Sequence, residues 1–456
     1  MDTKTIPIVA VPPAEPAEVS LYEISRKIYP RAVHGWFATW RWALVWLTQI
    51  VFYGLPWLAW NGRQAVLFDL GARKFAIFGL VFWPQDVIYL AVLLILSALA
   101  LFLFTAIAGR VWCGYACPQT VYTEMFLWVE RRIEGDRLAR IRLDAEPLSA
   151  RKLGRKAAKH AIWAAIGLWT GITFVGYFTP IRELIRAMPF SLGPWETFWV
   201  LFYGFATYGN AGWMREQVCK YMCPYARFQS AMFDQDTLVI TYDAKRGEPR
   251  GKGSASGDCV DCGICVQVCP TGIDIRDGLQ YECIGCAACI DGCNQVMSKV
   301  GKPQKLIRYS TLNAIDGKRT RVLRPRVLVY SLILLSIALG AAATLYLRTP
   351  LKVDVIRDRA AIAREVEGGL IENVYRLQIM NTTEEARAFH VSVRGLPDIH
   401  VWGEPTVGVP AATSRMVPVK VRSAPAAPGT HPIEFEVRAL GVEGVAVREH
   451  SVFIVR

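Results

Sequence analysis

The hydrophobic pattern of the chain contains five apolar stretches close to the ~20 residues that a helix needs to cross a lipid bilayer. They are Trp42–Trp60, Val87–Ala108, Ala161–Thr179, Thr197–Met214 and Val327–Leu347. The second and fifth are uncharged and rich in leucine, whereas the third and fourth contain glycine, threonine and Asn210. Small and weakly polar residues favour helices that pack on one another. Five membrane-spanning helices are therefore expected, with buried helices of a soluble protein as the alternative for the third and fourth. The short apolar run Phe75–Trp83 is too brief to span and is expected at the surface.

Lysine and arginine are distributed unevenly over the loops between these stretches. The loop after the second stretch is the richest, with Arg110, Arg131, Arg132, Arg137, Arg140, Arg142, Arg151, Lys152, Arg155, Lys156 and Lys159. The loop after the first has Arg63, Arg73 and Lys74, and the loop after the third has Arg182 and Arg186. Cytoplasmic loops carry the excess of positive charge, so the second loop, the N-terminus and the segment after the fourth stretch are expected in the cytoplasm. The region after the fifth stretch is then expected in the periplasm of a Gram-negative bacterium.

From Lys352 onward the pattern changes to alternating apolar and polar positions, which is typical of half-buried strands. The clearest runs are Val374–Ile379, Phe389–Val393, Val417–Val421 and Ile433–Val437. About seven short strands separated by turn residues predict an immunoglobulin-like sandwich. It would lack a disulfide, because all twelve cysteines lie between residues 113 and 293.

The composition agrees with a membrane protein and argues against nucleic-acid binding. The chain has 456 residues, of which 53% are apolar, and a formal net charge of +13. No helix-turn-helix, RNA-binding aromatic signature or zinc finger accompanies that charge, so it is read as the positive charge of cytoplasmic loops. The basic segment 300–326 is interpreted as a solvated hinge attracted to anionic lipid.

Eight cysteines form two runs of the pattern C-x2-C-x2-C-x3-C. The first run is Cys259, Cys262, Cys265 and Cys269, and the second is Cys283, Cys286, Cys289 and Cys293. This spacing is that of bacterial ferredoxins with two [4Fe–4S] clusters, in which the fourth cysteine of a run binds the other cluster. Cluster 1 is therefore assigned to Cys259, Cys262, Cys265 and Cys293, and cluster 2 to Cys283, Cys286, Cys289 and Cys269. Zinc sites or disulfides are the alternatives. Asn294 stands where a second proline is usual, which leaves the rigidity of the second loop open.

The other four cysteines form a repeated C-x-Y-x-C-P motif. Cys113 and Cys117 follow the second apolar stretch, and Cys219 and Cys223 follow the fourth. If each pair lies on a helix, its two side chains share one face. Soft thiolates select copper(I), zinc or iron–sulfur clusters, so these four residues are the candidate catalytic and copper-binding residues. Small buried side chains are the alternative reading, and Met125, Met214 and Met222 are candidate additional ligands.

Together these patterns predict an α-helical membrane protein with an inserted 2[4Fe–4S] ferredoxin domain and a C-terminal all-β sandwich. The expected divisions are a cytoplasmic tail (1–35), a four-helix membrane domain with both C-x3-C-P motifs (36–230), a cytoplasmic ferredoxin domain (231–310), a basic hinge with the fifth helix (311–350) and a periplasmic immunoglobulin-like domain (351–456).

The order of these parts resembles the cytochrome c oxidase accessory protein CcoG family, also called FixG or RdxA. The motifs that carry the resemblance are Phe82–Asp86, Trp112–Pro118, Val218–Pro224, the ferredoxin run and Val355–Arg359. The membrane and ferredoxin half alone also resembles the quinol-dehydrogenase proteins NapH and NosR. The family resemblance implies reduction of copper(II) to copper(I) for assembly of cbb3-type oxidases. It also implies oxidase assembly factors or copper chaperones as partners, besides membrane lipid.

Two other functions remain open from the sequence. The chain could be a quinol dehydrogenase or electron conduit whose helices bind quinone, or a non-catalytic scaffold whose sandwich docks an oxidase subunit. Nothing in the sequence identifies the electron donor, since no G-x-G-x-x-G loop indicates a flavin or nicotinamide site.

Overall fold

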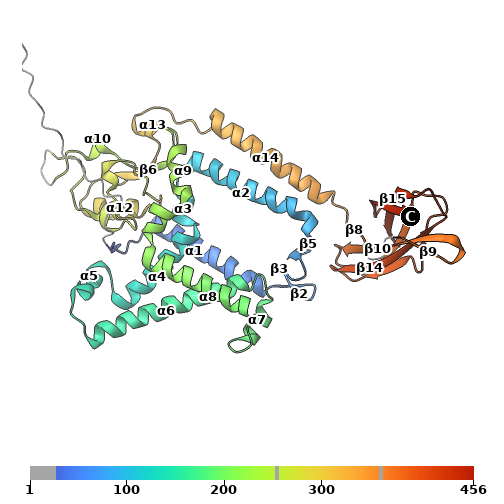
Figure 1. Ribbon diagram of the computed structural model, residues 1–456. Coiled ribbons are helices and arrows are strands. Elements are labelled where there is room, and N and C mark those ends of the chain that lie inside the picture. Colours follow the sequence, from blue (N-terminus) through green and yellow to red (C-terminus); the bar gives the residue numbers. More distant parts are fainter. Residues whose placement is uncertain (1–26, 252–255, 359–362, 456) are drawn as a thin grey trace, which may run out of the picture.

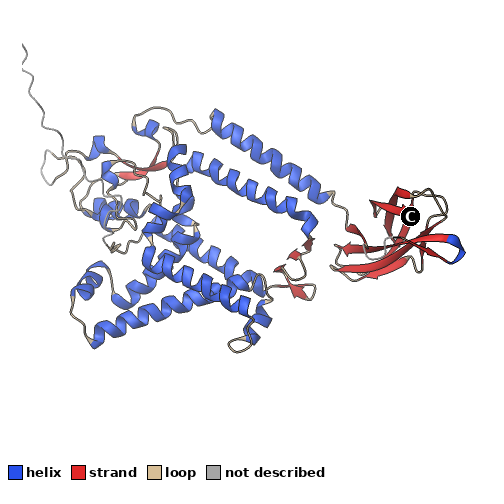
Figure 2. Cartoon of the chain, in the orientation of Figure 1, coloured by secondary structure: helices blue, strands red, loops and turns tan. Residues whose placement is uncertain are grey.

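The computed structural model describes residues 27–251, 256–358 and 363–455. Long helices occupy the middle of the molecule, with a cysteine-rich segment at one end and an all-β domain at the other (Figure 1). The cartoon in Figure 2 shows the same division, with most of the strands gathered in the C-terminal domain.

Five long helices correspond to the five apolar stretches. They are α1 (Trp36–Gly54), α2 (Val87–Ala108), α6 (Ala150–Val175), α8 (Pro194–Tyr208) and α14 (Pro325–Tyr346). Among the described residues, two helical segments, Pro84–Ala108 and Pro325–Tyr346, are long and apolar enough to cross a membrane. The bounds of α2 agree with the prediction, whereas α6 begins eleven residues earlier than the predicted Ala161, at Ala150. The predicted fourth stretch ends as a helix at Tyr208 and continues as a π-helical turn, Gly209–Met214.

Close packing of α6 on α8 depends on glycine. Gly167 and Gly171 lie one turn apart on α6, and a Cβ atom on Gly167 would come within 2.7 Å of the carbonyl oxygen of Gly204 on α8. A Cβ atom on Gly171 would overlap the carbonyl oxygen of Val200. Small residues four apart allow two helix backbones to approach closely, as is common in membrane helices. The helices α2 and α14 form a second pair, which runs side by side in Figure 1.

Further helices connect these five on the side of the cysteine-rich segment. They are α3 (Val111–Tyr115), α4 (Pro118–Glu134), α5 (Arg137–Ala145) and α9 (Pro224–Met232). A buried ion network holds α4 to its neighbours: Glu130 contacts Arg140 at 3.0 Å and Arg215 at 3.0 Å, and Glu134 contacts Lys159 at 2.9 Å. These basic residues, expected from their charge in a cytoplasmic loop, are thus partly buried and paired.

The cysteine-rich segment is bracketed by two paired strands and locked onto α1. Strands β6 (Val239–Tyr242) and β7 (Ile307–Ser310) are antiparallel, and between them lie α10 (Ala244–Gly247), α11 (Ile264–Gln267) and α12 (Ala288–Lys299). Asp291 on α12 accepts a hydrogen bond of 2.8 Å from the backbone N–H of Ala38. A carboxylate at the start of α1 satisfies N–H groups that have no partner within the helix.

At the opposite end of the helices the chain forms small hairpins. Strands β1 (Ala59–Trp60) and β2 (Arg63–Gln64) pair with each other, and β3 (Val66–Asp69), β4 (Lys74–Ile77) and β5 (Leu80–Phe82) form a three-stranded sheet. The run Phe75–Trp83 thus supplies most of two strands of this sheet. The backbone N–H of Phe68 donates to the carbonyl oxygen of Tyr177, 2.7 Å away, so the first and third loops meet, close to α7 (Ile181–Ala187).

The C-terminal domain is the predicted sandwich. One sheet has the order β12-β14-β10-β8 with β9 beside β10, and the other has the order β13-β11-β15-β16. The strands are β8 (Leu351–Arg357), β9 (Arg364–Val366), β10 (Leu370–Asn381), β11 (Arg387–Arg394), β12 (His400–Trp402), β13 (Thr406–Val409), β14 (Ser414–Ser423), β15 (Gly429–Ala439) and β16 (Ala446–Val455). All four predicted runs lie in strands. Tyr375, Phe389, Phe435 and Phe453 are fully buried between the sheets.

Two junctions fix the ends of α14. At its start, Arg324 is buried and pairs with Asp234 and with the carbonyl oxygen of Ala106 at the end of α2. The interpretation of residues 300–326 as wholly solvated is therefore wrong at Arg324, where α13 (Leu312–Ile315) leads into α14. At its end, the buried carboxylate of Asp86 pairs with Arg348 and Lys352. The Phe82–Asp86 motif thus joins α2, α14 and the sandwich.

Candidate redox site

The eight cysteines of the ferredoxin run line two small cavities. Cys259, Cys262, Cys265 and Cys293 line one of them. Cys269, Cys283, Cys286 and Cys289 line the other, to which Cys265 also contributes. The structure therefore brings together the same two sets that the crossed pattern assigns to clusters 1 and 2. Four thiols around one cavity are the donor set of a [4Fe–4S] cluster.

Local backbone geometry explains why the chain can fold around these cavities. Gly263 has φ +64° and Gly285 has φ +69°, a conformation that side chains with a Cβ atom rarely adopt. Asn294, which replaces the usual proline, accepts a hydrogen bond of 2.8 Å from the backbone N–H of Lys305. This hydrogen bond joins α12 to the segment before β7. It restrains the second cysteine loop where a proline would otherwise do so.

Burial disfavours free thiolates in both cavities. It raises the pKa of Cys265 and of Cys283 to about 12 and the pKa of Cys293 to about 11. Thiolates in such surroundings need a positive partner, and iron in a cluster is one. All twelve cysteines are free thiols in the structure, which argues against the disulfide alternative.

The C-x3-C-P motifs are not continuous helices, so the expectation that each pair shares one helix face is wrong. Cys113 lies in α3, but Cys117 is the extended residue before α4, with φ −61° and ψ +129°. Cys219 lies in the π-helical turn Val218–Met222, and Cys223 is the extended residue before α9. The physical reason is the following proline, which disfavours the helical conformation of the residue before it. Pro118 and Pro224 begin helices instead of ending them.

Both motifs meet the loop that carries the second cysteine run. Cys113 and Cys219 pack against a buried cluster of Val268, Ile284, Cys286 and Ala288. Gly114 lies against this loop so closely that a Cβ atom there would be 2.7 Å from Cα of Cys286. Cys113 and Cys219 are thus neighbours of a loop that carries predicted cluster 2 ligands.

Two polar residues that the sequence did not reveal connect the motifs. Gln229 on α9 is fully buried. Its Oε1 accepts hydrogen bonds from Nε of Arg110 at 2.9 Å and from Sγ of Cys113 at 3.3 Å. Arg110 is buried as well and also donates to the carbonyl oxygen of Tyr281. Their positions next to the repeated motifs, Arg110 before the first and Gln229 after the second, are the signal that sequence reasoning could have used.

The four motif cysteines lie close enough to influence one another. Burial raises the pKa of Cys219 to about 12, and the charges of Cys117, Cys113 and Cys223 would raise it further, against Arg110. In the described part of the chain, however, no group of three or more His, Cys, Asp or Glu side chains is arranged to hold a metal ion. The described structure therefore does not arrange Cys113, Cys117, Cys219 and Cys223 as a metal-ion site.

Two of the three candidate methionine ligands, Met125 and Met222, lie in different surroundings. Met125 packs against the cluster of Phe126, Val129, Trp163 and Ala211. Met222 is exposed. These observations favour a packing role for Met125 over a thioether ligand.

Cysteine-lined cavities of ferredoxin spacing beside long apolar helices define the class of membrane-associated iron–sulfur proteins. Comparisons with known proteins agree with this class. Family models described as "4Fe-4S dicluster domain" and "4Fe-4S binding domain" match residues 214–312 and 90–135, and "IG-like fold at C-terminal of FixG" matches residues 341–456. The chain belongs to the FixG/RdxA family.

The similarity to members of that family extends over nearly the whole chain. It is 40% identical over 456 residues to "Nitrogen fixation protein FixG" of Rhizobium meliloti, covering 88% of this chain and 87% of that protein. It is 40% identical over 415 residues to "Protein RdxA" of Cereibacter sphaeroides, covering 86% and 88%. "Ferredoxin-type protein NapH" of Haemophilus influenzae is 24% identical over 226 residues, covering 46% of this chain and 68% of that protein.

Proposed function

We propose that the protein is a membrane-bound iron–sulfur electron-transfer protein that reduces copper(II) to copper(I) for assembly of a cbb3-type cytochrome c oxidase. The observation that carries the proposal is the contact between the two C-x3-C-P motifs and the Cys286 loop. Iron–sulfur clusters supply single electrons, and copper(II) needs one electron to become copper(I). Copper is a substrate in this proposal, bound by cysteines taken from the two motifs.

The cysteine sets support the cofactor part of the proposal. Cys259, Cys262, Cys265 and Cys293 would hold one [4Fe–4S] cluster, and Cys283, Cys286, Cys289 and Cys269 the other. Gly114 brings the first motif against the second of these sets. Because thiolates prefer copper(I) over copper(II), the pairs Cys113–Cys117 and Cys219–Cys223 would favour the reduced product.

The arrangement of helix ends supports a topology with five membrane helices. The start of α1, the end of α2 and the start of α14 lie beside the cysteine-rich segment, and the opposite ends lie beside the hairpins and the sandwich. The proposed location is the inner membrane, with the 231–310 segment in the cytoplasm and the sandwich in the periplasm. There the sandwich would meet copper chaperones or oxidase assembly factors.

The test is a comparison of two sets of serine variants of the full-length protein, purified without oxygen. In the first set, Cys113, Cys117, Cys219 and Cys223 are replaced together. We expect unchanged iron content and cluster signals in electron paramagnetic resonance, but loss of copper binding and of copper(I) formation, followed with a copper(I)-specific chelator. In the control, Cys293→Ser, iron content should fall while copper binding persists.

Unchanged copper stoichiometry in the fourfold serine variant would remove the proposed copper site. Loss of iron in that variant would show instead that the four cysteines serve the clusters. Either result distinguishes copper binding by the four cysteines from binding of the iron–sulfur clusters, which the family models describe.

A further inference from the structure

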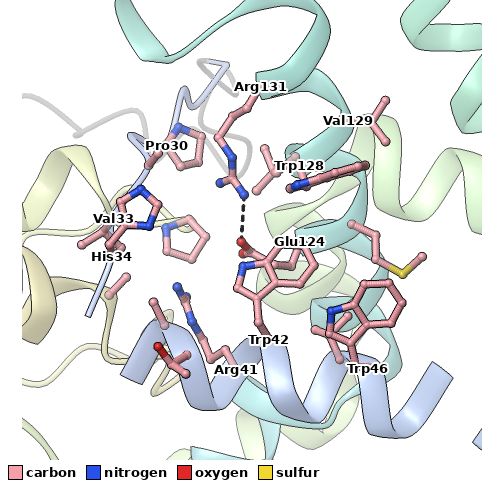
Figure 3. Close-up of a pocket in the computed structure, with 18 of the residues that line it drawn as sticks. Pro30, Val33, His34, Arg41, Trp42, Trp46, Glu124, Trp128, Val129 and Arg131 are labelled. Carbon is pink, nitrogen blue, oxygen red and sulfur yellow. Dashed lines mark hydrogen bonds and ion pairs between the residues drawn. The ribbon is translucent and has the colours of Figure 1, made fainter. Parts of the chain in front are cut away.

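A large cavity lies between α1 and α4, next to the cysteine-rich segment. Its volume is about 1150 Å³, which exceeds the space that a drug-sized ligand usually occupies. Figure 3 shows Arg41, Trp42 and Trp46 on α1 facing Glu124, Trp128 and Arg131 on α4. Val268, Pro270 and Ala288 of the cysteine-rich segment also line it. The cavity therefore reaches from the apolar helices to the loops of the predicted cluster 2.

One end of the cavity is charged and buried. Nη2 of Arg131 lies 3.1 Å from Oε1 of Glu124, and the side chain of Arg41 is only 8% exposed. Burial opposes ionisation of Glu124, yet Arg41 and Arg131 hold the pKa of its carboxyl below its usual value. Val268 and Ala288, which line the cavity, belong to one buried cluster with Cys286, a predicted cluster ligand. The cavity thus lies next to the residues that pack around predicted cluster 2.

Two buried polar atoms on residues that line this cavity have no hydrogen-bond partner among the described residues. They are Nε of Arg41, a donor, and Oε1 of Gln49, an acceptor. Gln49 is 9% exposed and lies on α1 two turns after Arg41. A buried polar atom without a partner costs about 1–3 kcal/mol, so this pair is suited to a ligand that both accepts and donates a hydrogen bond.

Aromatic side chains form much of the rest of the cavity wall, and apolar side chains of α1 beside them are exposed. Trp42, Trp46 and Trp128 line the cavity, and Trp46 and Ile50 on α1 are 63% and 65% exposed. Indole rings offer flat surfaces for stacking on another ring. The exposed apolar side of α1 gives a hydrophobic molecule a route from lipid into the cavity.

We propose that this cavity binds an isoprenoid quinone or quinol, with its ring between the tryptophans and its oxygens at Arg41 and Gln49. An oxygen of either form accepts from Arg41, whereas only the quinol has a hydroxyl group that donates to Gln49, so the quinol fits both atoms. The remaining volume receives part of the isoprenoid tail. A quinol bound here belongs to the class of electron donor that the proposed function requires, and in that respect the inference rests on that function.

A phospholipid is the other hydrophobic ligand that a membrane supplies, but the charged end of the cavity disfavours its binding. A phosphate group beside Arg41 would face the Glu124 carboxylate, which is ionised and already shared by two arginines. A neutral ring with one acceptor and one donor meets no such repulsion. The shape and the unpaired atoms thus favour the quinol.

The test is quenching of tryptophan fluorescence by decylubiquinol, kept reduced without oxygen and measured on the full-length protein in zwitterionic nanodiscs. In Val45→Phe a ring fills the cavity from a buried position on α1, and in Leu47→Phe the same ring is added on the exposed side of that helix. Saturable quenching is expected in the wild type and in Leu47→Phe. It should weaken at least about tenfold in Val45→Phe and about tenfold in Gln49→Leu, which removes the acceptor but keeps a similar volume.

Equal affinity in Val45→Phe and Leu47→Phe, or absence of saturable quenching in the wild type, would overturn the proposal. So would competition by anionic phospholipid with the same dependence on these variants, since the occupant would then be a lipid. Iron content and circular dichroism identify a variant that fails to fold, and Gln49→Leu then decides. Copper reduction is measured in parallel on protein that has been reduced with dithionite and then freed of excess dithionite by gel filtration before copper(II) is added. A Val45→Phe protein that reduces copper but binds no quinol separates this site from the copper function.

Discussion

At the residue scale, Gly114 joins the two halves of the candidate site. It lies between Cys113 and Cys117, and a Cβ atom there would be 2.8 Å from the backbone nitrogen of Cys286 and 2.8 Å from the carbonyl carbon of Gly285. These neighbours are backbone atoms, which cannot rotate away as a side chain does. The motif therefore needs glycine at this position so that the loop after α2 can touch the cluster-binding loop.

Replacement of this glycine tests that contact. Gly114→Ala should destabilise the protein by about 1–3 kcal/mol, the usual cost of overpacking a closed contact, and should lower the occupancy of the second cysteine set. The measurements are thermal unfolding and iron per chain. Gly340→Ala on α14, where a Cβ atom meets nothing within 4 Å, is the control. Normal stability and iron content in Gly114→Ala would show that the two loops move independently.

Some residues of the site could be predicted from the sequence and others could not. Three cysteines of each set follow from short-range spacing, because ligands two residues apart can reach corners of one cluster. The fourth follows from the crossed pattern of two-cluster ferredoxins. Arg41, Arg110 and Gln229 depend on contacts between distant segments. Arg110 and Gln229 lie near the repeated motifs in the sequence, but their burial and their hydrogen bond to each other follow only from the fold.

At the scale of elements, the pairing of α6 with α8 rests on Gly167 and Gly171. In Gly171→Ala the added methyl group would overlap the carbonyl oxygen of Val200, so the helices must separate and the protein should lose about 1–3 kcal/mol. Gly154→Ala on the same helix meets nothing within 4 Å and should gain up to about 1 kcal/mol from helix propensity. Thermal unfolding in detergent measures both. Equal melting temperatures would contradict the close packing.

The sequence predicted the long elements better than their interruptions. The extent of α2 follows from one uninterrupted apolar run, and the strands of the sandwich follow from strict alternation. The breaks at Cys117 and Cys223 were missed because cysteine spacing alone was read as helical, although the prolines that follow them forbid it. The hairpins β1 to β5 were missed because strands of two to four residues carry too few positions to show a period.

At the scale of the whole molecule, contacts between distant segments gather at the two opposite ends of the long helices. Asp291 on α12 caps α1, and Leu238 before β6 donates to the carbonyl oxygen of Ile107 in α2. At the other end, Arg63 pairs with Glu384 of the sandwich at 2.7 Å, and Trp83 packs with Met380. A bilayer crossed by α2 and α14 would therefore separate the cysteine-rich segment from the sandwich.

This separation predicts which parts of the chain an antibody reaches in intact spheroplasts. The same epitope is inserted after Gly317, in the exposed turn before α14, or after Gly444, in the exposed turn between β15 and β16; a Cβ atom would meet nothing within 4 Å at either glycine. The epitope after Gly444 should be labelled without lysis, because the proposed topology places the sandwich in the periplasm. The epitope after Gly317 should be labelled only after lysis, because the basic residues around it hold this turn in the cytoplasm. Labelling of the Gly317 epitope in intact spheroplasts would place the clusters outside, where no cytoplasmic donor could reach them.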